Sequence, residues 1–122
     1  GVYDKVFAYM KQSSSAKVYA DLNLFQRSVM YWQLQLTFGD EFYKVIGKRY
    51  REMTDKPQTS DAEIQRFILE TSIVSGYDLS PFFEMWGLRP SSATKSSINA
   101  LSLNELTQPI WDNRDSDVKY RL

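Results

Sequence analysis

The segment between Asn23 and Gly39 carries the strongest structural signal in the chain. Asn23 is a residue type that caps helix N-termini, and Gln26 three residues later completes a capping box, in which each side chain accepts a hydrogen bond from the other residue's backbone N–H. A glycine just after the last apolar residue commonly ends a helix, and Gly39 has that place. The pattern predicts a helix whose buried face holds Phe25, Val29, Trp32 and Leu36.

Similar start and stop signals recur along the chain. Apolar residues at helical spacing predict further helices near residues 1–12, 41–53, 61–75, 81–86 and 92–100. Asp40 follows Gly39 directly, so we expect the two helices at this tight joint to pack antiparallel. Residues 101–106 are expected to be extended or a short helical turn, and residues 112–117 a turn or a frayed end. The predicted fold class is all-α, a compact bundle of about four to six helices with an irregular C-terminal tail.

Composition limits the functions open to this chain. Its 122 residues suit one domain, and 15 basic against 15 acidic residues leave no net charge to hold nucleic acid. No apolar stretch is long enough for a membrane span. The sequence has no cysteine and no histidine, so it cannot build a cysteine or histidine zinc site or a serine–histidine pair by itself.

Carboxylates are the remaining candidates for acid–base chemistry. The pairs Asp40 with Glu41 and Asp61 with Glu63 stand at predicted helix N-termini, where negative charge is favoured by the helix dipole. A third group lies in the polar tail at Asp112, Asp115 and Asp117. Helix capping and solvation explain these residues better than catalysis does, and a carboxylate-only hydrolase is the weakest of the functional hypotheses.

Tryptophans are candidates for ligand contact. Trp32 and Trp86 lie on predicted apolar faces, where a buried tryptophan is expected to be a packing unit. Trp111 follows Pro109 outside any clear helix, so exposure and ligand contact are open to it. Phe82, Phe83 and Trp86 are expected to anchor the core.

Two stretches of sequence resemble a known family. They are RSVMYWQL at 27–34, followed by FGD at 38–40 and FY at 42–43, and SPFFEMWGL at 80–88. In this order they look like the C-terminal helical part of the M60-like, or enhancin-like, zinc metallopeptidases, over residues 19–111. The resemblance implies that residues 1–122 are a single helical domain or subdomain, the C-terminal fragment of a larger peptidase domain.

That resemblance also implies an activity that lies outside these residues. Members of the family attack mucin-like glycoproteins and hold zinc with an H-E-x-x-H helix and a later glutamate, and no such motif occurs here. We therefore assign no catalytic, cofactor-binding or metal-binding residue to this chain. The implied partners are an upstream catalytic half of the same polypeptide, with its zinc, and a glycoprotein substrate, and the implied location is extracellular or at the cell surface.

Arg27 and Tyr31 are the candidate residues through which this chain would contribute to the catalytic site of the upstream half. They are four positions apart on one helix and both belong to the matching motif. A polar pair beside an apolar face needs partners or a ligand, so the pair either lines or buttresses the cleft of the upstream half, or forms an ordinary hydrogen-bond network. The alternative function is a self-standing helical module that binds glycan or protein through Trp111 and its neighbours.

Overall fold

The helices begin and end close to the positions that the sequence pattern predicts. The computed structural model describes all 122 residues. Six α-helices and three 3-10 turns make up most of the chain, so the predicted all-α fold is confirmed. The helices are α1 (Val2–Met10), α2 (Leu24–Phe38), α3 (Phe42–Glu52), α4 (Ser60–Ser75), α5 (Ser80–Met85) and α6 (Ser92–Asn99), and the turns are η1 (Ser14–Ala16), η2 (Tyr19–Asp21) and η3 (Ile110–Asp112).

The capping box at the start of α2 forms as predicted. The backbone N–H of Gln26 donates to Asn23 Oδ1 over 2.8 Å, and the N–H of Asn23 donates to Gln26 Oε1 over 2.9 Å. The S-x-x-E pattern at Ser60 and Glu63 predicts Ser60 as the cap of α4. The cap is instead Thr59, one residue earlier, whose Oγ1 accepts from the N–H of Ala62 over 3.1 Å. At α2 and α4, local capping chemistry therefore sets the helix start to within a residue.

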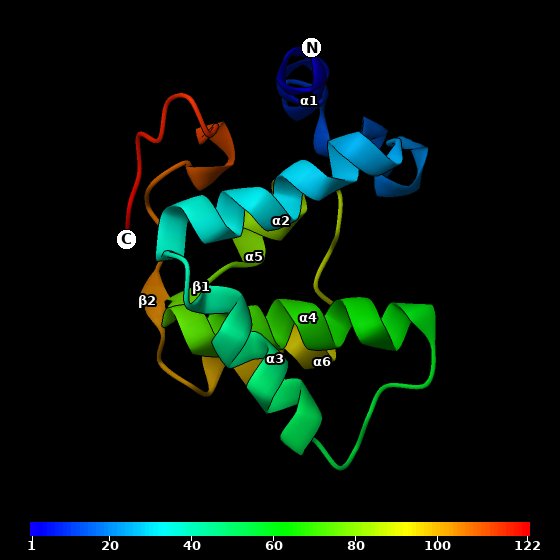
Figure 1. Cartoon of the computed structure of the whole chain (residues 1–122). Coiled ribbons are helices and arrows are strands. Elements are labelled where there is room, and N and C mark those ends of the chain that lie inside the picture. The colour runs from blue at the N-terminus through cyan, green and yellow to red at the C-terminus, as the bar shows by residue number, and fades with distance from the viewer.

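The helices form two groups that lie one above the other (Figure 1). The upper group contains α1, α2, α5 and the C-terminal tail, and the lower group contains α4 with α3 and α6 packed against it. Between α2 and α3 the chain turns at Gly39, whose φ of 100° is a conformation that glycine adopts without strain. The two helices diverge from this glycine and α3 packs chiefly on α4, so the expected antiparallel pair does not form.

A short parallel β-pair joins the two groups at one side. Strand β1 (Tyr77–Asp78) pairs with β2 (Asn104–Glu105), with Tyr77 opposite Asn104. The backbone N–H of Asn104 also donates to the carbonyl of Gly76 over 2.9 Å. Of the two conformations expected for residues 101–106, the structure contains a short extended one.

Helix α5 fills the centre of the molecule. Phe82, Phe83 and Trp86 are completely buried, so the predicted core anchors are confirmed. Trp86 is also held by polar contacts, because its indole N–H donates to Gln33 Oε1 over 3.1 Å and its carbonyl accepts from the hydroxyl of Tyr9 over 2.7 Å. This aromatic core connects α1, α2 and α5 into one unit.

Helix α2 buries a different face from the predicted one. Val29 is buried as expected, but Phe25 and Trp32 are exposed, whereas the polar residues Gln33 and Thr37 are buried. The prediction for Phe25 and Trp32 is therefore wrong. Hydropathy assigns glutamine and threonine to solvent, and it misses the polar groups that α2 meets on its inner side.

Those polar groups belong to the C-terminal segment, which packs along α2. The side-chain amide of Gln33 donates to the carbonyls of Trp111 and Asn113, over 2.7 and 3.0 Å. A short 3-10 turn and the loop after it leave backbone carbonyls without partners of their own, and these carbonyls need partners when the segment is buried. The polar side of α2 supplies those partners, and this turns the helix so that its aromatic side faces outward.

Asn113 holds the tail in place. Its Nδ2 donates to Thr37 Oγ1 over 2.9 Å and to the carbonyl of Tyr120 over 2.8 Å, and its Oδ1 accepts from the N–H groups of Lys119 and Tyr120 over 2.9 and 3.0 Å. Residues 114 and 117 exchange two backbone hydrogen bonds, which confirms a turn in this segment. A frayed end, the other expectation for residues 112–117, is wrong because the buried Asn113 side chain fastens them.

Candidate functional site

The outward face of α2 is mostly apolar and largely exposed, with the exposed Ser28 between its large side chains. Leu24 and Phe25 are 77% and 74% exposed, and Tyr31 and Trp32, about two helical turns later, are 44% and 42% exposed. We call these four residues the α2 outer face. None of the helices in the chain, α2 included, has the length and apolar character needed to cross a membrane.

Arg27 is the single charged residue of α2, and its guanidinium is hydrogen-bonded to backbone carbonyls of the same chain. Its Nε donates to the carbonyl of Leu22 over 2.9 Å, and one terminal nitrogen donates to the carbonyl of Ala20 over 2.7 Å. The guanidinium also lies 5.6 Å from the ring centre of Tyr19. Arg27 therefore fixes the 3-10 turn η2 against the start of α2, and the outer face itself has no charge.

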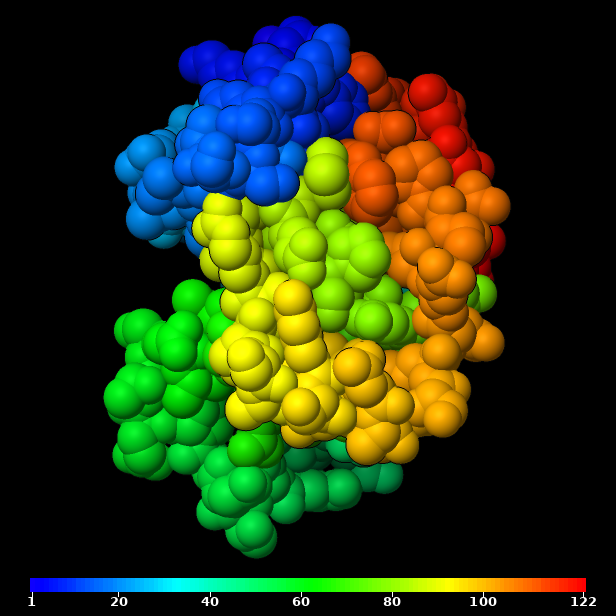
Figure 2. All heavy atoms as spheres, turned by 180° about the vertical axis from the view of Figure 1, so that it is seen from behind, coloured from blue at the N-terminus to red at the C-terminus, as the bar shows by residue number.

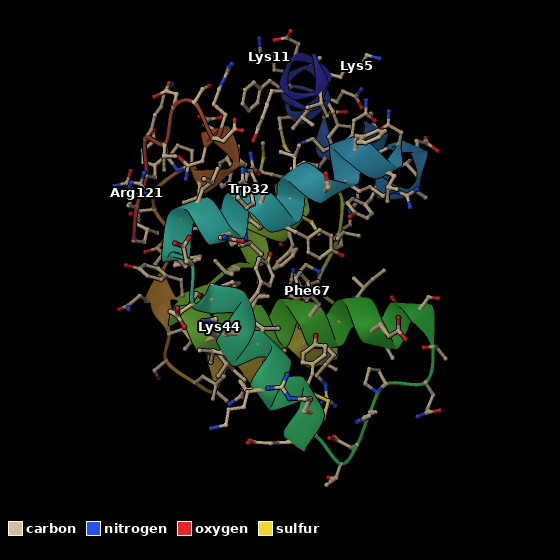
Figure 3. All side chains as sticks on the ribbon, in the orientation of Figure 1. Lys5, Lys11, Trp32, Lys44, Phe67 and Arg121 are labelled. Carbon is tan, nitrogen blue, oxygen red and sulfur yellow. The ribbon has the colours of Figure 1, made fainter.

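Tyr31 lies on the α2 outer face and also reaches toward the lower group of helices. Its ring centre is 5.3 Å from that of Phe67, a residue of α4 that Figure 3 shows between α2 and α4. Its backbone carbonyl accepts the hydroxyl hydrogen bond of Tyr43 over 2.6 Å. The structure thus places Arg27 and Tyr31 in different surroundings, with Arg27 on η2 and Tyr31 at the junction of the two groups.

A pocket of ≈ 330 Å³ opens at this junction. Figure 2 shows the hollow from behind, where η2 stands above the start of α4. We call it the tyrosine pocket because it contains the rings of Tyr19, Tyr31 and Tyr50. Its remaining lining residues are Met30, Ser60, Glu63, Ile64, Phe67 and Leu88.

The hydroxyls of Tyr19, Tyr43 and Tyr50 have raised pKa values and stay protonated at neutral pH. Burial raises the pKa of Tyr50 to about 12, and the nearby negative charge of Glu70 adds to the effect. Burial also raises the pKa of Tyr19 and of Tyr43 well above the usual range. The hydroxyl of Tyr50 is buried and has no hydrogen-bond partner in the protein, so this donor is left unused in the interior.

A second pocket, of ≈ 420 Å³, lies between the end of α1, α5 and the tail. Trp111 lines it and is partly exposed, as the sequence had left open. The basic residues Lys11, Arg114 and Lys119 line the same pocket, and Asp112 is its one acidic residue. This pocket can offer an aromatic surface together with positive charge.

The carboxylates do not assemble into a cluster that could hold a metal ion. Asp61 and Glu63 lie in the first turn of α4, and Glu41 stands directly before α3, as the helix-dipole interpretation predicts. No three side chains of the metal-ligating types come together anywhere in the chain. The residues present therefore do not fit the zinc site that the family resemblance implies.

Sequence patterns did not find the tyrosine pocket. Tyr19, Tyr31 and Tyr50 lie on three separate elements, so no spacing rule connects them. The helical spacing of apolar residues over 41–53 predicts Tyr50 on a buried face, but this spacing does not show whether the hydroxyl of Tyr50 has a hydrogen-bond partner. Only the packing of α2 over α4 brings the three rings together.

Comparison with known proteins places the chain in a family context. Residues 3–87 match the family described as peptidase M60, enhancin and enhancin-like. A TRPM8 channel-associated factor homolog from Danio rerio is 31% identical over 83 residues, which is 68% of this chain and 8% of that protein.

Two solved structures share the fold. Both are of a functionally unknown conserved protein from Bacillus anthracis, one of them a mutant. The first is 38% identical with a TM-score of 0.89 over 100% of this chain, and the mutant is 36% identical with a TM-score of 0.91 over 99%. This chain spans 25% of the length of each.

Proposed function

Since the chain belongs to the peptidase M60, enhancin and enhancin-like family, we propose that it is the non-catalytic, C-terminal helical portion of a larger zinc metallopeptidase. In this proposal it packs against a catalytic half that precedes it in the same polypeptide, and that half supplies the zinc and its ligands. The α2 outer face is the observation that carries the proposal, because it has the composition of a buried surface.

The α2 outer face is poorly suited to water. Surface helices normally place charged residues on the side away from the core, but the only charge on α2 is the arginine already bonded to η2. Clustered exposed apolar side chains mark interaction sites in soluble proteins. Burying a large apolar side chain is worth roughly 1.5–3 kcal/mol, so covering the two most exposed ones would contribute several kcal/mol to a docked state.

Arg27 and Tyr31 have different roles in this proposal. Arg27 holds η2 and the start of α2 in position, so it supports the docking surface from within. Tyr31 lies on the docking surface beside the tyrosine pocket, where its exposed ring can contact the catalytic half or line its cleft. For the whole polypeptide we further propose a mucin-like glycoprotein substrate and an extracellular or cell-surface location, both on the strength of the family resemblance.

Substitutions on the α2 outer face test the proposal. Leu24→Ser with Phe25→Ser, at the two most exposed positions of the face, should abolish cleavage of a mucin-type glycoprotein by the whole polypeptide, while the melting temperature of the isolated 122-residue chain stays nearly unchanged. Val45→Ser, at an exposed apolar position on α3, is the matched control and should leave cleavage intact. Full activity of the double variant would contradict the proposal.

The paired residues of the motif need their own test. Arg27→Ala should lower the stability of the isolated chain, because two carbonyls lose their donor. Tyr31→Phe removes only the hydroxyl, so it should leave stability unchanged and lower turnover if that hydroxyl lines the cleft. If both variants kept turnover and only the melting temperature fell, a cleft-lining role for this pair would be abandoned.

A second candidate function is a self-standing binding module for glycan or protein. It is supported by Trp111, which lines the larger pocket beside three basic residues. Titrating the isolated chain with glycans and following its NMR spectrum separates the two candidates. A saturable shift confined to Trp111 and its neighbours would favour the module, and the absence of any shift would favour the docked portion.

A further inference from the structure

We propose that the pocket between α1, α5 and the tail binds an acidic sugar, a pyranose ring that carries a carboxylate or a sulfate group. We call this pocket the basic pocket; in Figure 2 the light-green spheres of α5 lie between the blue N-terminal segment and the orange-to-red tail. The inference rests on the binding-module function and names its ligand class. It does not require docking on a catalytic half, because every lining residue belongs to this chain.

The wall of the basic pocket carries more positive than negative charge. Its one acidic residue is Asp112, and its basic residues are Lys11, Arg114 and Lys119. Lys119 also lies 3.8 Å from the carboxylate of Asp117, but both side chains are more than half exposed, so this ion pair is weak. Lys11 and Arg114 form no ion pair within the chain. The pocket therefore attracts a ligand with a negative charge.

A buried lysine behind the wall adds to this positive charge. Lys17 is only 3% exposed and forms no ion pair, although buried lysines are normally paired. Its Nζ lies 3.6 Å from the sulfur of Met85, which lines the basic pocket. Lys17 thus raises the electrostatic potential of the pocket from behind Met85, without contacting the ligand itself.

The guanidinium of Arg114 is held in place and is still free to bind. It lies 4.7 Å from the ring centre of Phe7 on α1, a cation–π contact that fixes its position. The side-chain hydrogen bonds that arginines donate in this chain all come from other arginines. The flat fork of N–H donors on Arg114 can therefore bind the oxygens of a carboxylate or a sulfate.

Trp111 supplies a flat wall for the sugar ring. Its backbone carbonyl accepts the amide hydrogen bond of Gln33 over 2.7 Å, which fixes the turn η3 that presents the partly exposed indole. The C–H face of a pyranose packs on such a ring, and Met10 and Met85 extend the apolar surface. The volume of ≈ 420 Å³ is in the usual range of small-ligand sites, roughly 300–1,000 Å³.

Asp112 favours a ring with hydroxyl groups over an aromatic acid. It follows Trp111 directly, and its exposed carboxylate forms no ion pair within the chain. A carboxylate only accepts hydrogen bonds, and sugar hydroxyls can donate them. An aromatic acid has no donor for Asp112 and would bring a second negative charge beside it. The mixed charges of the wall thus match a ring with one anionic group and several hydroxyls.

The test compares methyl glucuronide with methyl glucoside in NMR titrations of the 122-residue chain. The two sugars differ only in a carboxylate that replaces a hydroxymethyl group. The glucuronide should bind about tenfold more tightly, as expected for a charge-assisted hydrogen bond at a partly exposed site. Raising NaCl from about 0.1 to about 1 M should remove most of this preference, because the Debye length falls from about 10 to about 3 Å.

The tryptophan signals and three variants locate the site. Both sugars should shift the indole N–H signal of Trp111 and leave that of Trp86, which donates to Gln33, in place. Arg114→Gln should bring the two affinities to within about twofold, and Lys11→Gln, at the exposed end of α1, should lower the preference about threefold. Lys5→Gln is the matched control, since Lys5 is exposed on another side of α1 and outside the basic pocket (Figure 3). A dispersed spectrum checks that each variant is folded.

The outcomes separate this inference from the function on which it rests. Equal affinity for the two sugars, or a preference that survives in both Arg114→Gln and Lys11→Gln, would overturn the acidic sugar and leave a glycan-binding module standing. Tighter binding of benzoate or of adenosine monophosphate would also overturn it. No response to either sugar would overturn the module as well. Glucose 6-sulfate identifies the anionic group, because binding at least as tight as that of the glucuronide indicates a sulfated sugar and weaker binding indicates a uronic acid.

Discussion

Replacing Asn113 with alanine should strongly destabilise the chain, because this side chain connects the tail to α2. The carboxamide makes four hydrogen bonds, two as donor to Thr37 and Tyr120 and two as acceptor from the N–H groups of Lys119 and Tyr120. Each such bond contributes about 1 kcal/mol net, so their combined loss should cost about 3–4 kcal/mol. In a domain of this size that corresponds to a fall in melting temperature of about 10–15 °C.

Urea and thermal unfolding of the isolated chain measure this effect. Asn104→Ala is the matched control, because Asn104 is exposed and its side chain makes no hydrogen bond, so its change should stay within about 0.5 kcal/mol. The amide of Leu122, which donates to the carbonyl of Thr37, should also exchange faster in Asn113→Ala. A loss no larger than that of the control would refute the idea that Asn113 fastens the tail.

Three further predictions concern other positions in the same core. Gly87→Ala should lower the free energy of unfolding in urea by about 2–4 kcal/mol, because Gly87 has a φ of 84° and a methyl group there would lie 2.5 Å from the hydroxyl of Tyr9. Gly47→Ala, inside helix α3, should instead raise the free energy of unfolding by about 0.5–1 kcal/mol. Tyr9→Phe should lower the free energy of unfolding by about 1 kcal/mol, since the hydrogen bond to the carbonyl of Trp86 is lost. Tyr50→Phe should leave it unchanged, because the hydroxyl of Tyr50 has no partner, and equal losses in the two variants would contradict this reasoning. The raised pKa of Tyr50, about 12 against 10.0, favours the folded state below pH 10, and that stability is lost as the pH rises through 12. Between these two pKa values the free energy of unfolding would fall by at most about 1.4 kcal/mol per pH unit, and by less because Tyr50 is only half-buried. The urea midpoint should therefore fall less between pH 9 and 11 in Tyr50→Phe than in the unaltered chain.

The helices were predictable because their signals are local. The capping box at Asn23 and the glycine at Gly76 act on residues within one turn, so sequence spacing alone defines them. The buried aromatic run at 82–86 was predictable for a related reason, since a short helix with three large apolar side chains in a chain of this size belongs in the core.

The orientation of α2 was not predictable from the same pattern. Its two sides are similar in hydropathy, and the choice between them depends on Gln33, whose partners lie at Trp111 and Asn113. Such contacts join residues far apart in the sequence. The tyrosine pocket was not predicted for the same reason. The family resemblance rests on motifs that are continuous along the chain, and it correctly indicated the family to which the chain belongs.

The central claim is that the α2 outer face is buried against a catalytic half. Hydroxyl-radical footprinting of Phe25 and Trp32, in the isolated chain and in the whole polypeptide, measures this burial without any substitution. Our account predicts that both side chains are oxidised readily in the isolated chain and are strongly protected in the whole polypeptide, with Val45 on α3 as the internal reference. Equal oxidation of Phe25 and Trp32 in both forms would contradict it.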